Sequence, residues 1–212
     1  MILESLKSIR HFLAEDVRTA RRYLSSLKIF ESMESLSFEV LNKDTKSSEL
    51  ETLLQPALEG HHLGVLSESG CPGVADPGAM AVAAAHEKGI RVIPLSGPSS
   101  ILLALMASGL NGQRFAFHGY LPVDKQEAAA AIRQLELESG KKSQTQIFIE
   151  TPYRNNSLFE NLIRTLSGTT LLCVAMDLTG SEEKISTKTV SAWLKGSHPW
   201  PKLPAVFLFL AR

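Results

Sequence analysis

Short apolar segments alternate with longer amphipathic stretches along most of the chain. The apolar segments are too short for core helices and are typical of buried β-strands. They cover residues 63–67, 91–95, 115–118, 146–150, 171–175 and 205–210. The predicted helices lie between them, over residues 79–88, 99–108, 125–138 and 156–166. This alternation predicts an α/β fold with mainly parallel sheets that are covered by helices on both faces.

Turn residues predict a division into two α/β domains. The run Gly119-Tyr120-Leu121-Pro122 separates two helix-rich stretches. It predicts an N-terminal domain over residues 1–119 and a C-terminal domain over residues 120–212. Within the second, residues 139–143 are expected to form an exposed connector. Residues 184–190 alternate with Thr and Ser as in an antiparallel strand, and a Pro/Trp loop follows over 197–203.

The loop over residues 67–78 is the most informative segment, with the sequence SESGCPGVADPG. It follows one predicted strand and leads into a helix, and ligands of open parallel sheets bind beyond the carboxyl ends of strands. Its glycines allow backbone amides to approach a ligand closely. It contains neither a dinucleotide-binding GxGxxG nor a P-loop G-K-[ST]. Gly and Pro also occur in such loops for turning alone, so a binding role and a purely structural one both stay open.

A second strand-to-helix turn, over residues 92–100, has the sequence VIPLSGPSS. Its amides and hydroxyls could receive a polar ligand at the helix N-terminus. An ordinary serine cap is the simpler interpretation of this segment alone.

Composition narrows the class of protein. Of the 212 residues, 44% are hydrophobic, which argues against a disordered chain. The 22 Lys+Arg balance 22 Asp+Glu, and this zero net charge argues against a dedicated non-specific nucleic-acid binder. The two cysteines, Cys71 and Cys173, are too few for a disulfide framework and lack metal-ligand spacing, and His61-His62 lack a third ligand. No metal site, membrane span or signal peptide is expected, and we predict a cytoplasmic protein.

Six separated motifs resemble those of one family. The loop over 67–78 resembles S-D-A-G-x-P-G-x-x-D-P-G, and Gly97-Pro98-Ser99-Ser100 resembles P-G-P-S-A. The segment FAFHGYLP resembles F-x-F-x-G-F-L-P. AEDVR at 14–18 resembles A-E-D-x-R, and ETPYR at 150–154 and AMDLT at 175–179 resemble E-S-P-H-R and A-R-E-L-T. The chain is therefore similar to the tetrapyrrole methylase superfamily of S-adenosylmethionine-dependent methyltransferases, nearest its small-subunit rRNA ribose 2′-O-methyltransferase branch.

The resemblance implies two α/β domains with S-adenosylmethionine bound in a cleft between them, commonly in a homodimer. Carried over by motif, the cofactor-binding residues would be Glu68, Ser69, Gly70, Asp76, Pro77, Gly78, Ser99, Ser100, Ile101, Thr151, Pro152, Ala175 and Met176. Such a cofactor needs a carboxylate or carbonyls near its positive sulfur and apolar cover for its adenine.

The chain departs from the family pattern in three respects. Family members open with an apolar strand and a Pro/Gly loop, whereas this sequence begins with what resembles the following helix, so we expect that strand to be missing. Glu68 occupies the position of a shorter aspartate, and because the sequence ends at Arg212, we expect the basic C-terminal extension of many rRNA-modifying members to be missing.

Charged residues near the N-terminus could serve the acceptor substrate. Arg18, Arg21 and Arg22 recur at helical spacing after Glu15 and Asp16. They could contact RNA phosphates, or they could form an ordinary solvated helix face. A ribose hydroxyl acceptor would also require a base, for which Asp16 and Asp76 are the candidates. Glu15, Arg18 and Arg154 are candidate substrate-binding residues.

The methyl acceptor itself stays open at this point. RNA is the first hypothesis, and a small tetrapyrrole-like metabolite is the alternative enzyme substrate. A third possibility is a truncated, catalytically silent family member.

Overall fold

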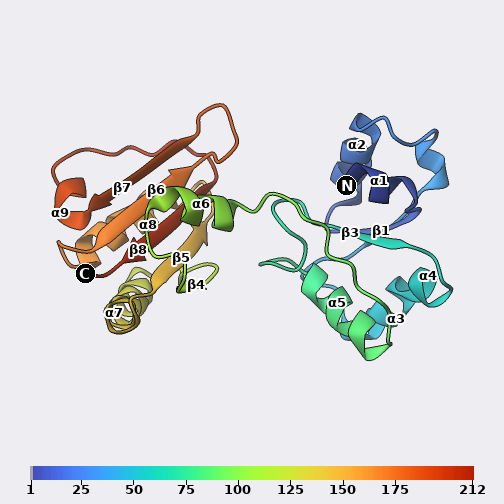
Figure 1. Cartoon of the computed structure of the whole chain (residues 1–212), viewed down its shortest axis with the longest axis horizontal. Helices are drawn as coiled ribbons and strands as arrows, with labels where there is room; N and C mark the ends of the chain where they lie inside the picture. The colour runs from blue at the N-terminus through green and yellow to red at the C-terminus, as the bar shows by residue number, and fades with distance from the viewer. Residues whose placement is uncertain (1) are drawn as a thin grey trace. The chain divides into compact units, whose positions relative to one another are not determined.

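The computed structural model describes residues 2–212, so Met1, which the sequence analysis counted in the opening segment, lies outside the described residues. The chain divides into two compact units, of which the first ends at Ser99 and the second begins at Ser100 (Figure 1). The predicted boundary after residue 119 lies later in the chain. The structure places helix α6 (Ser100–Ser108) and strand β4 (Phe115–Phe117) in the second unit because both pack on its sheet.

The first unit is built on a parallel sheet of three strands in the order β2-β1-β3. These are β1 (His11–Ala14), β2 (Ser37–Val40) and β3 (Leu63–Leu66). They end in register, because Ala14 of β1 lies opposite both Val40 and Leu66.

Helices cover both faces of this first sheet (Figure 1). The side chains of β1 alternate, so that Phe12 packs with α1 (Ile2–Lys7) and α2 (Val17–Ser26), while Leu13 packs with α3 (Leu50–Leu53) and α5 (Gly78–Glu87). The short helices η1 (Met33–Ser35), η2 (Ser47–Glu49) and α4 (Gln55–Leu58) lie in the connections.

The second unit contains a mixed sheet of five strands in the order β4-β5-β8-β6-β7. Besides β4, its strands are β5 (Thr145–Glu150), β6 (Leu171–Met176), β7 (Lys184–Thr189) and β8 (Ala205–Leu210). Helix α6 covers one face, where Ala104 and Leu105 pack on alternate residues of the strands. The opposite face packs against α7 (Lys125–Lys142), α8 (Asn155–Thr165) and α9 (Val190–Trp193).

The α/β fold class is confirmed, and the expectation of mainly parallel sheets is correct only for the first unit. In the second, β4 and β5 are parallel, but β8 pairs antiparallel with both β5 and β6, and β7 antiparallel with β6. The apolar strands β5, β6 and β8 are buried on both faces, so their side chains carry no signal of strand direction. The antiparallel strand predicted over 184–190 is confirmed as β7.

Two local predictions are wrong. Residues 91–95 form no strand, because within residues 2–212 no neighbouring strand supplies a hydrogen-bonded partner. Val92 packs on the core of the first unit, while Ile93 and Leu95 are exposed. Residues 139–143 are not a connector, because α7 continues to Lys142 and ends at Ser143 in the left-handed conformation. Buried Ser139 holds this end in place by donating from its hydroxyl to the Gln144 carbonyl, 2.7 Å away. Among the described residues, no helix combines the length and hydropathy that a membrane crossing requires.

Candidate functional site

The carboxyl ends of the first sheet bring two sequence motifs together. Since β1 and β3 are parallel and end in register at Ala14 and Leu66, Glu15 and the loop over 67–78 leave the sheet at the same edge. This is the position where ligands of parallel sheets bind. The two motifs therefore belong to one candidate site, which we call the first carboxyl edge.

Asp76 organises the loop of the first carboxyl edge. Its Oδ1 accepts hydrogen bonds from the backbone amides of Gly73, at 2.8 Å, and Gly78, at 2.7 Å. A Cβ atom at position 78 would lie 2.6 Å from that oxygen, so the sequence requires glycine there. The other carboxylate oxygen, Oδ2, is buried without a hydrogen-bond donor. Asp76 is therefore fixed in place through its Oδ1 atom.

Three carboxylates interact at this edge. The pKa of Glu15 is raised, first by burial and then by a hydrogen bond with the Asp76 side chain and by the negative charges of Asp76 and Glu68. A hydrogen bond from the Glu68 backbone acts in the opposite direction. Like charges close together disfavour full ionisation, so Glu15 holds its proton more tightly than an ordinary glutamate.

Asp16, one of the two predicted catalytic bases, has a structural role in the fold. It is the N-cap of α2, and its Oδ1 accepts a hydrogen bond from the Thr19 amide at 2.7 Å. This bond lowers the pKa of Asp16, which makes its carboxylate a weaker base. The geometry therefore favours Asp76 and Glu15 over Asp16 for proton transfer.

The remaining predicted residues of this loop are accessible. Glu68, Ser69 and Gly70 are exposed, and the space beside Gly70, which has a φ of +77°, is open. Pro77 is half-buried next to the fixed Asp76. The Cys71 thiol lies 3.6 Å from the Pro98 carbonyl, which links the loop to the segment that carries Ser99.

The second unit gathers its motifs at an edge of its own sheet. Strands β5 and β6 both pair antiparallel with β8, so they run parallel to each other, and Glu150 and Met176 both lie opposite Ala205. Thr151-Pro152 and Asp177 therefore follow at one edge, which we call the second carboxyl edge. The side chains of Ala175 and Met176 are buried in the core, so only their backbone is available to a ligand.

Helix α6 begins toward this second edge. Its C-terminal side is joined to the opposite end of the sheet, where the Thr145 hydroxyl donates to the Asn111 carbonyl at 2.9 Å. Ile101, near the start of the helix, packs in the same cluster as Ile149 and Leu178. Ser100 and Ile101 thus share an end of the second unit with Thr151 and Pro152.

Arg154, a predicted substrate-binding residue, is held by the protein itself. Its Nη2 lies 3.0 Å from Oε2 of Glu150, a carboxylate with no exposed surface, and also 3.4 Å from the Pro122 carbonyl. Glu150 Oε1 accepts from the Thr151 amide at 2.7 Å. Glu150 therefore fixes the loop that contains Thr151-Pro152. Glu150 is not among the site residues predicted from the sequence, because it ends a strand and the spacing of 150 to 154 along a loop does not indicate an ion pair.

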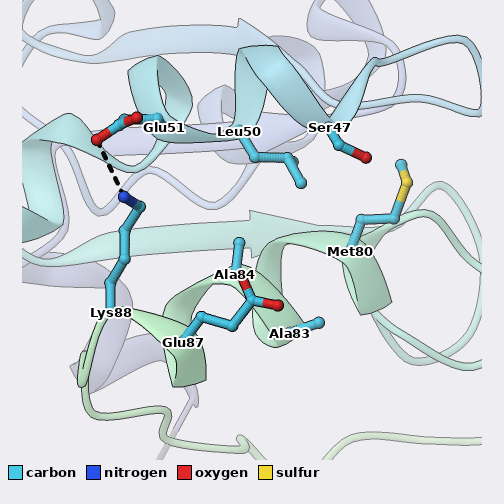
Figure 2. Close-up of a pocket in the computed structure, with 8 residues that line it drawn as sticks. All are labelled: Ser47, Leu50, Glu51, Met80, Ala83, Ala84, Glu87 and Lys88. Carbon is cyan, nitrogen blue, oxygen red and sulfur yellow. Dashed lines mark hydrogen bonds and ion pairs between the residues drawn. The ribbon is translucent and has the colours of Figure 1, made fainter.

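A groove of about 370 Å³ lies away from these motifs, between α5 and the η2–α3 segment (Figure 2). Met80, Leu50 and Ala84 line it, and an ion pair between Lys88 and Glu51, at 3.0 Å, lies at one end. None of the predicted site residues lines this groove, so it is not part of the candidate site.

The chain is similar in sequence to ribosomal RNA methyltransferases. No family model matches the chain. It is 31% identical over 196 residues to ribosomal RNA small subunit methyltransferase I of Escherichia coli O157:H7, covering 91% of this chain and 65% of the relative. The protein of the same name in Vibrio cholerae is 30% identical over 183 residues, covering 86% of this chain and 60% of the relative. The chain thus spans less than two thirds of the length of these relatives.

The fold is similar to that of a solved methyltransferase. The crystal structure of the methyltransferase CobJ matches with a TM-score of 0.64 and 18% identity, covering 99% of this chain and 86% of that one. The match in fold covers 99% of the chain and therefore extends over both units. The chain is thus similar in sequence to these rRNA methyltransferases and similar in fold to the methyltransferase CobJ.

Proposed function

We propose that the chain transfers a methyl group from S-adenosylmethionine to small-subunit ribosomal RNA, at a ribose 2′-hydroxyl. The observation that carries the proposal is the first carboxyl edge, where the loop over 67–78 holds Asp76 rigidly beside Glu15. The sequence similarity to the rRNA methyltransferases supports the class of substrate.

The residues of each edge, taken separately, fit parts of such a methyl donor. Asp76 Oδ2 is buried and accepts from no amide or hydroxyl group among residues 2–212, so together with Glu15 it is suited to a cationic or hydroxyl-bearing ligand, and Gly70 leaves open space beside the loop. At the second edge, Thr151-Pro152 and the backbone at Ala175 and Met176 would hold the adenosine part, and Ser99, Ser100 and Ile101 the methionine part. When bound, the donor supplies an electrophilic methyl group.

Glu15 and Asp76 would handle the proton of the acceptor hydroxyl. A base works best with a pKa near the working pH, and the pKa of Glu15 is shifted in that direction. Asp76 cannot reorient without losing its bonds to Gly73 and Gly78, so it would keep Glu15 in position. The remaining acceleration would come from aligning the acceptor with the methyl group.

Isothermal titration with S-adenosylmethionine, followed by tritium transfer from the labelled donor into small ribosomal subunits, tests this proposal. We expect saturable binding and label in a ribose of the small-subunit RNA. Absence of S-adenosylmethionine binding by the folded chain would refute the proposed activity, and transfer to a low-molecular-weight acceptor instead would refute the substrate.

We further propose a homodimer located in the cytoplasm, on the ground of the family resemblance. Light scattering coupled to size exclusion measures the mass of the assembly in solution, and cell fractionation locates the protein. A monomer at micromolar concentration would contradict the first part.

A further inference from the structure

Helix α2 carries an unusual distribution of charge. Its ten residues, Val17–Ser26, include Arg18, Arg21 and Arg22 and no acidic residue, in a chain whose net charge is zero. The buried face consists of Ala20 and Leu24, and all three arginines are on the exposed side. A local excess of positive charge on one helix is what binding to a polyanion requires.

One of the three arginines is used within the fold. The Arg21 guanidinium lies over the Phe38 ring, 5.3 Å from its centroid, and Nη2 is 3.5 Å from the Met33 carbonyl. Arg18 and Arg22 make no ion pair in the described part of the chain, apart from the attraction between Arg18 and the capping Asp16. They are the two arginines of α2 that are available to a ligand.

The positions of Arg18 and Arg22 are unfavourable for the isolated protein. Arg18 lies in the first turn, where the helix dipole favours negative charge. Arg22 is four residues later on the same face, a spacing at which like charges repel. A bound chain of phosphates would relieve both effects.

The location of α2 connects this surface to the candidate site. Its N-cap, Asp16, follows directly on Glu15, so the arginines begin at the first carboxyl edge. Tyr23 is adjacent to Arg22 and 51% exposed, which adds an aromatic ring on which an unpaired base can stack.

We propose that Arg18, Arg22 and Tyr23 of α2 bind single-stranded RNA beside the first carboxyl edge, with the arginines on successive phosphates and the tyrosine against a base. This inference rests on the proposed function for the identity of the polyanion. It assigns the RNA-binding surface to α2, so its experiment measures RNA affinity and not methyl transfer.

The test compares Arg18→Gln/Arg22→Gln with a matched control, Arg133→Gln/Lys141→Gln, which removes two exposed charges from α7. Affinity for a fluorescein-labelled single-stranded oligoribonucleotide is measured by fluorescence anisotropy from about 50 to 200 mM salt. Each phosphate contact on a single strand contributes about 0.7 to the slope of log affinity against log salt. The α2 variant should therefore lose about 1.4 from that slope and bind about 25-fold more weakly at about 0.1 M salt.

Counterion release also fixes how the difference changes with salt. The loss of RNA affinity in the α2 variant, relative to the parent, should shrink about sevenfold between about 50 and 200 mM salt. The variant Tyr23→Ala should weaken RNA binding at least about fivefold with little change in the salt slope. Equal slopes in the α2 variant and the parent, or the same loss in the α7 control, would overturn the inference. So would the absence of RNA binding by the parent.

The outcome is separable from that of the proposed function. If the chain binds S-adenosylmethionine and its RNA affinity is unchanged in the Arg18→Gln/Arg22→Gln variant, only the proposal of an RNA-binding surface on α2 is refuted. A chain that binds RNA through these arginines and does not bind S-adenosylmethionine would refute the methyltransferase proposal and leave the surface in place. Far-UV circular dichroism of each variant shows that it is folded.

Discussion

Replacing Gly78 by alanine tests the central feature of the candidate site. The added Cβ would lie 2.6 Å from Asp76 Oδ1 and 3.1 Å from the Gly73 amide nitrogen. The first distance is shorter than real Cβ contacts in folded proteins and the second is tighter than most of them, so the carboxylate must move. Because that oxygen accepts from Gly73 and Gly78 at 2.8 and 2.7 Å, moving it breaks the bonds that hold the loop.

The expected cost follows from those two bonds. Each hydrogen bond to a charged acceptor contributes about 2 kcal/mol, so their loss costs about 4 kcal/mol. Alanine is favoured over glycine in a helix by about 1 kcal/mol, and residue 78 is the first of α5. The free energy of unfolding of the first unit should therefore fall by about 3 kcal/mol.

Urea titration measures this change separately in each unit. Both tryptophans of the chain, Trp193 and Trp200, lie in the second unit, so their fluorescence reports on that unit, whereas hydrogen exchange of β1 and β3 peptides reports on the first. Gly140→Ala is the matched control, since its Cβ would make an ordinary 3.8 Å contact within the second unit. It should raise stability by up to about 1 kcal/mol. If Gly78→Ala were neutral or stabilising in the first unit, the role assigned to Asp76 would be refuted.

Two further predictions concern the carboxylates. The folded-state pKa of Glu15 is raised above 4.5, so the contribution of Glu15 to stability is present below that pH and is lost as the pH rises through the folded-state value. The variant Glu15→Gln should therefore unfold at a higher urea concentration than the parent at neutral pH and at the same urea concentration in acid. A difference between the two proteins that does not change with pH would contradict the raised pKa. Arg154→Met leaves the Glu150 carboxylate buried without its ion pair and should cost the second unit about 3 kcal/mol or more by tryptophan fluorescence. The double variant Glu150→Leu/Arg154→Met should cost less than Arg154→Met alone, and equal or additive losses would refute the pairing.

The strands and helices with many apolar contacts were predictable from the sequence. Strand β8 and helix α8 lie within a residue of their predicted bounds, because burial on both faces of a strand and on one face of a helix leaves a distinct pattern. The four-residue strands β1 and β2 were not predicted. Strands this short are defined by pairing with neighbours that are distant in sequence, and local pattern does not contain that information.

The incorrect prediction of a strand at residues 91–95 has the opposite cause. Its composition is that of a strand, but a strand exists only with a hydrogen-bonded neighbour, and within residues 2–212 none pairs with it. The expectation that the first strand of the family is missing stays a prediction.

For the site, the motifs predict which loops would carry the chemistry but not which atoms would perform it. The sequence predicted Asp16 and Asp76 as candidate bases and Glu15 as a candidate substrate-binding residue, and it gave no reason to prefer one base over the other. The structure distinguishes the three carboxylates by their hydrogen bonds. Asp16 accepts from the Thr19 amide, Asp76 is fixed by the amides that its Oδ1 accepts from, and the Glu15 side chain is hydrogen-bonded with that of Asp76. These differences depend on the fold of the loop, which contains glycines with positive φ at positions 70 and 73.

The motifs that follow β5 and β6 lie at one edge even though the strand directions of this sheet were predicted incorrectly. The reason is that β8 runs antiparallel between β5 and β6, which leaves these two parallel to each other with Glu150 and Met176 in register across Ala205. What gathers loops at one edge is the common direction of the strands that precede them, whatever strand lies between. The motifs at 150–154 and 175–179 could therefore be assigned to one edge from the order of the strands alone, and the ion pair of Glu150 with Arg154 then fixes the first of them in place.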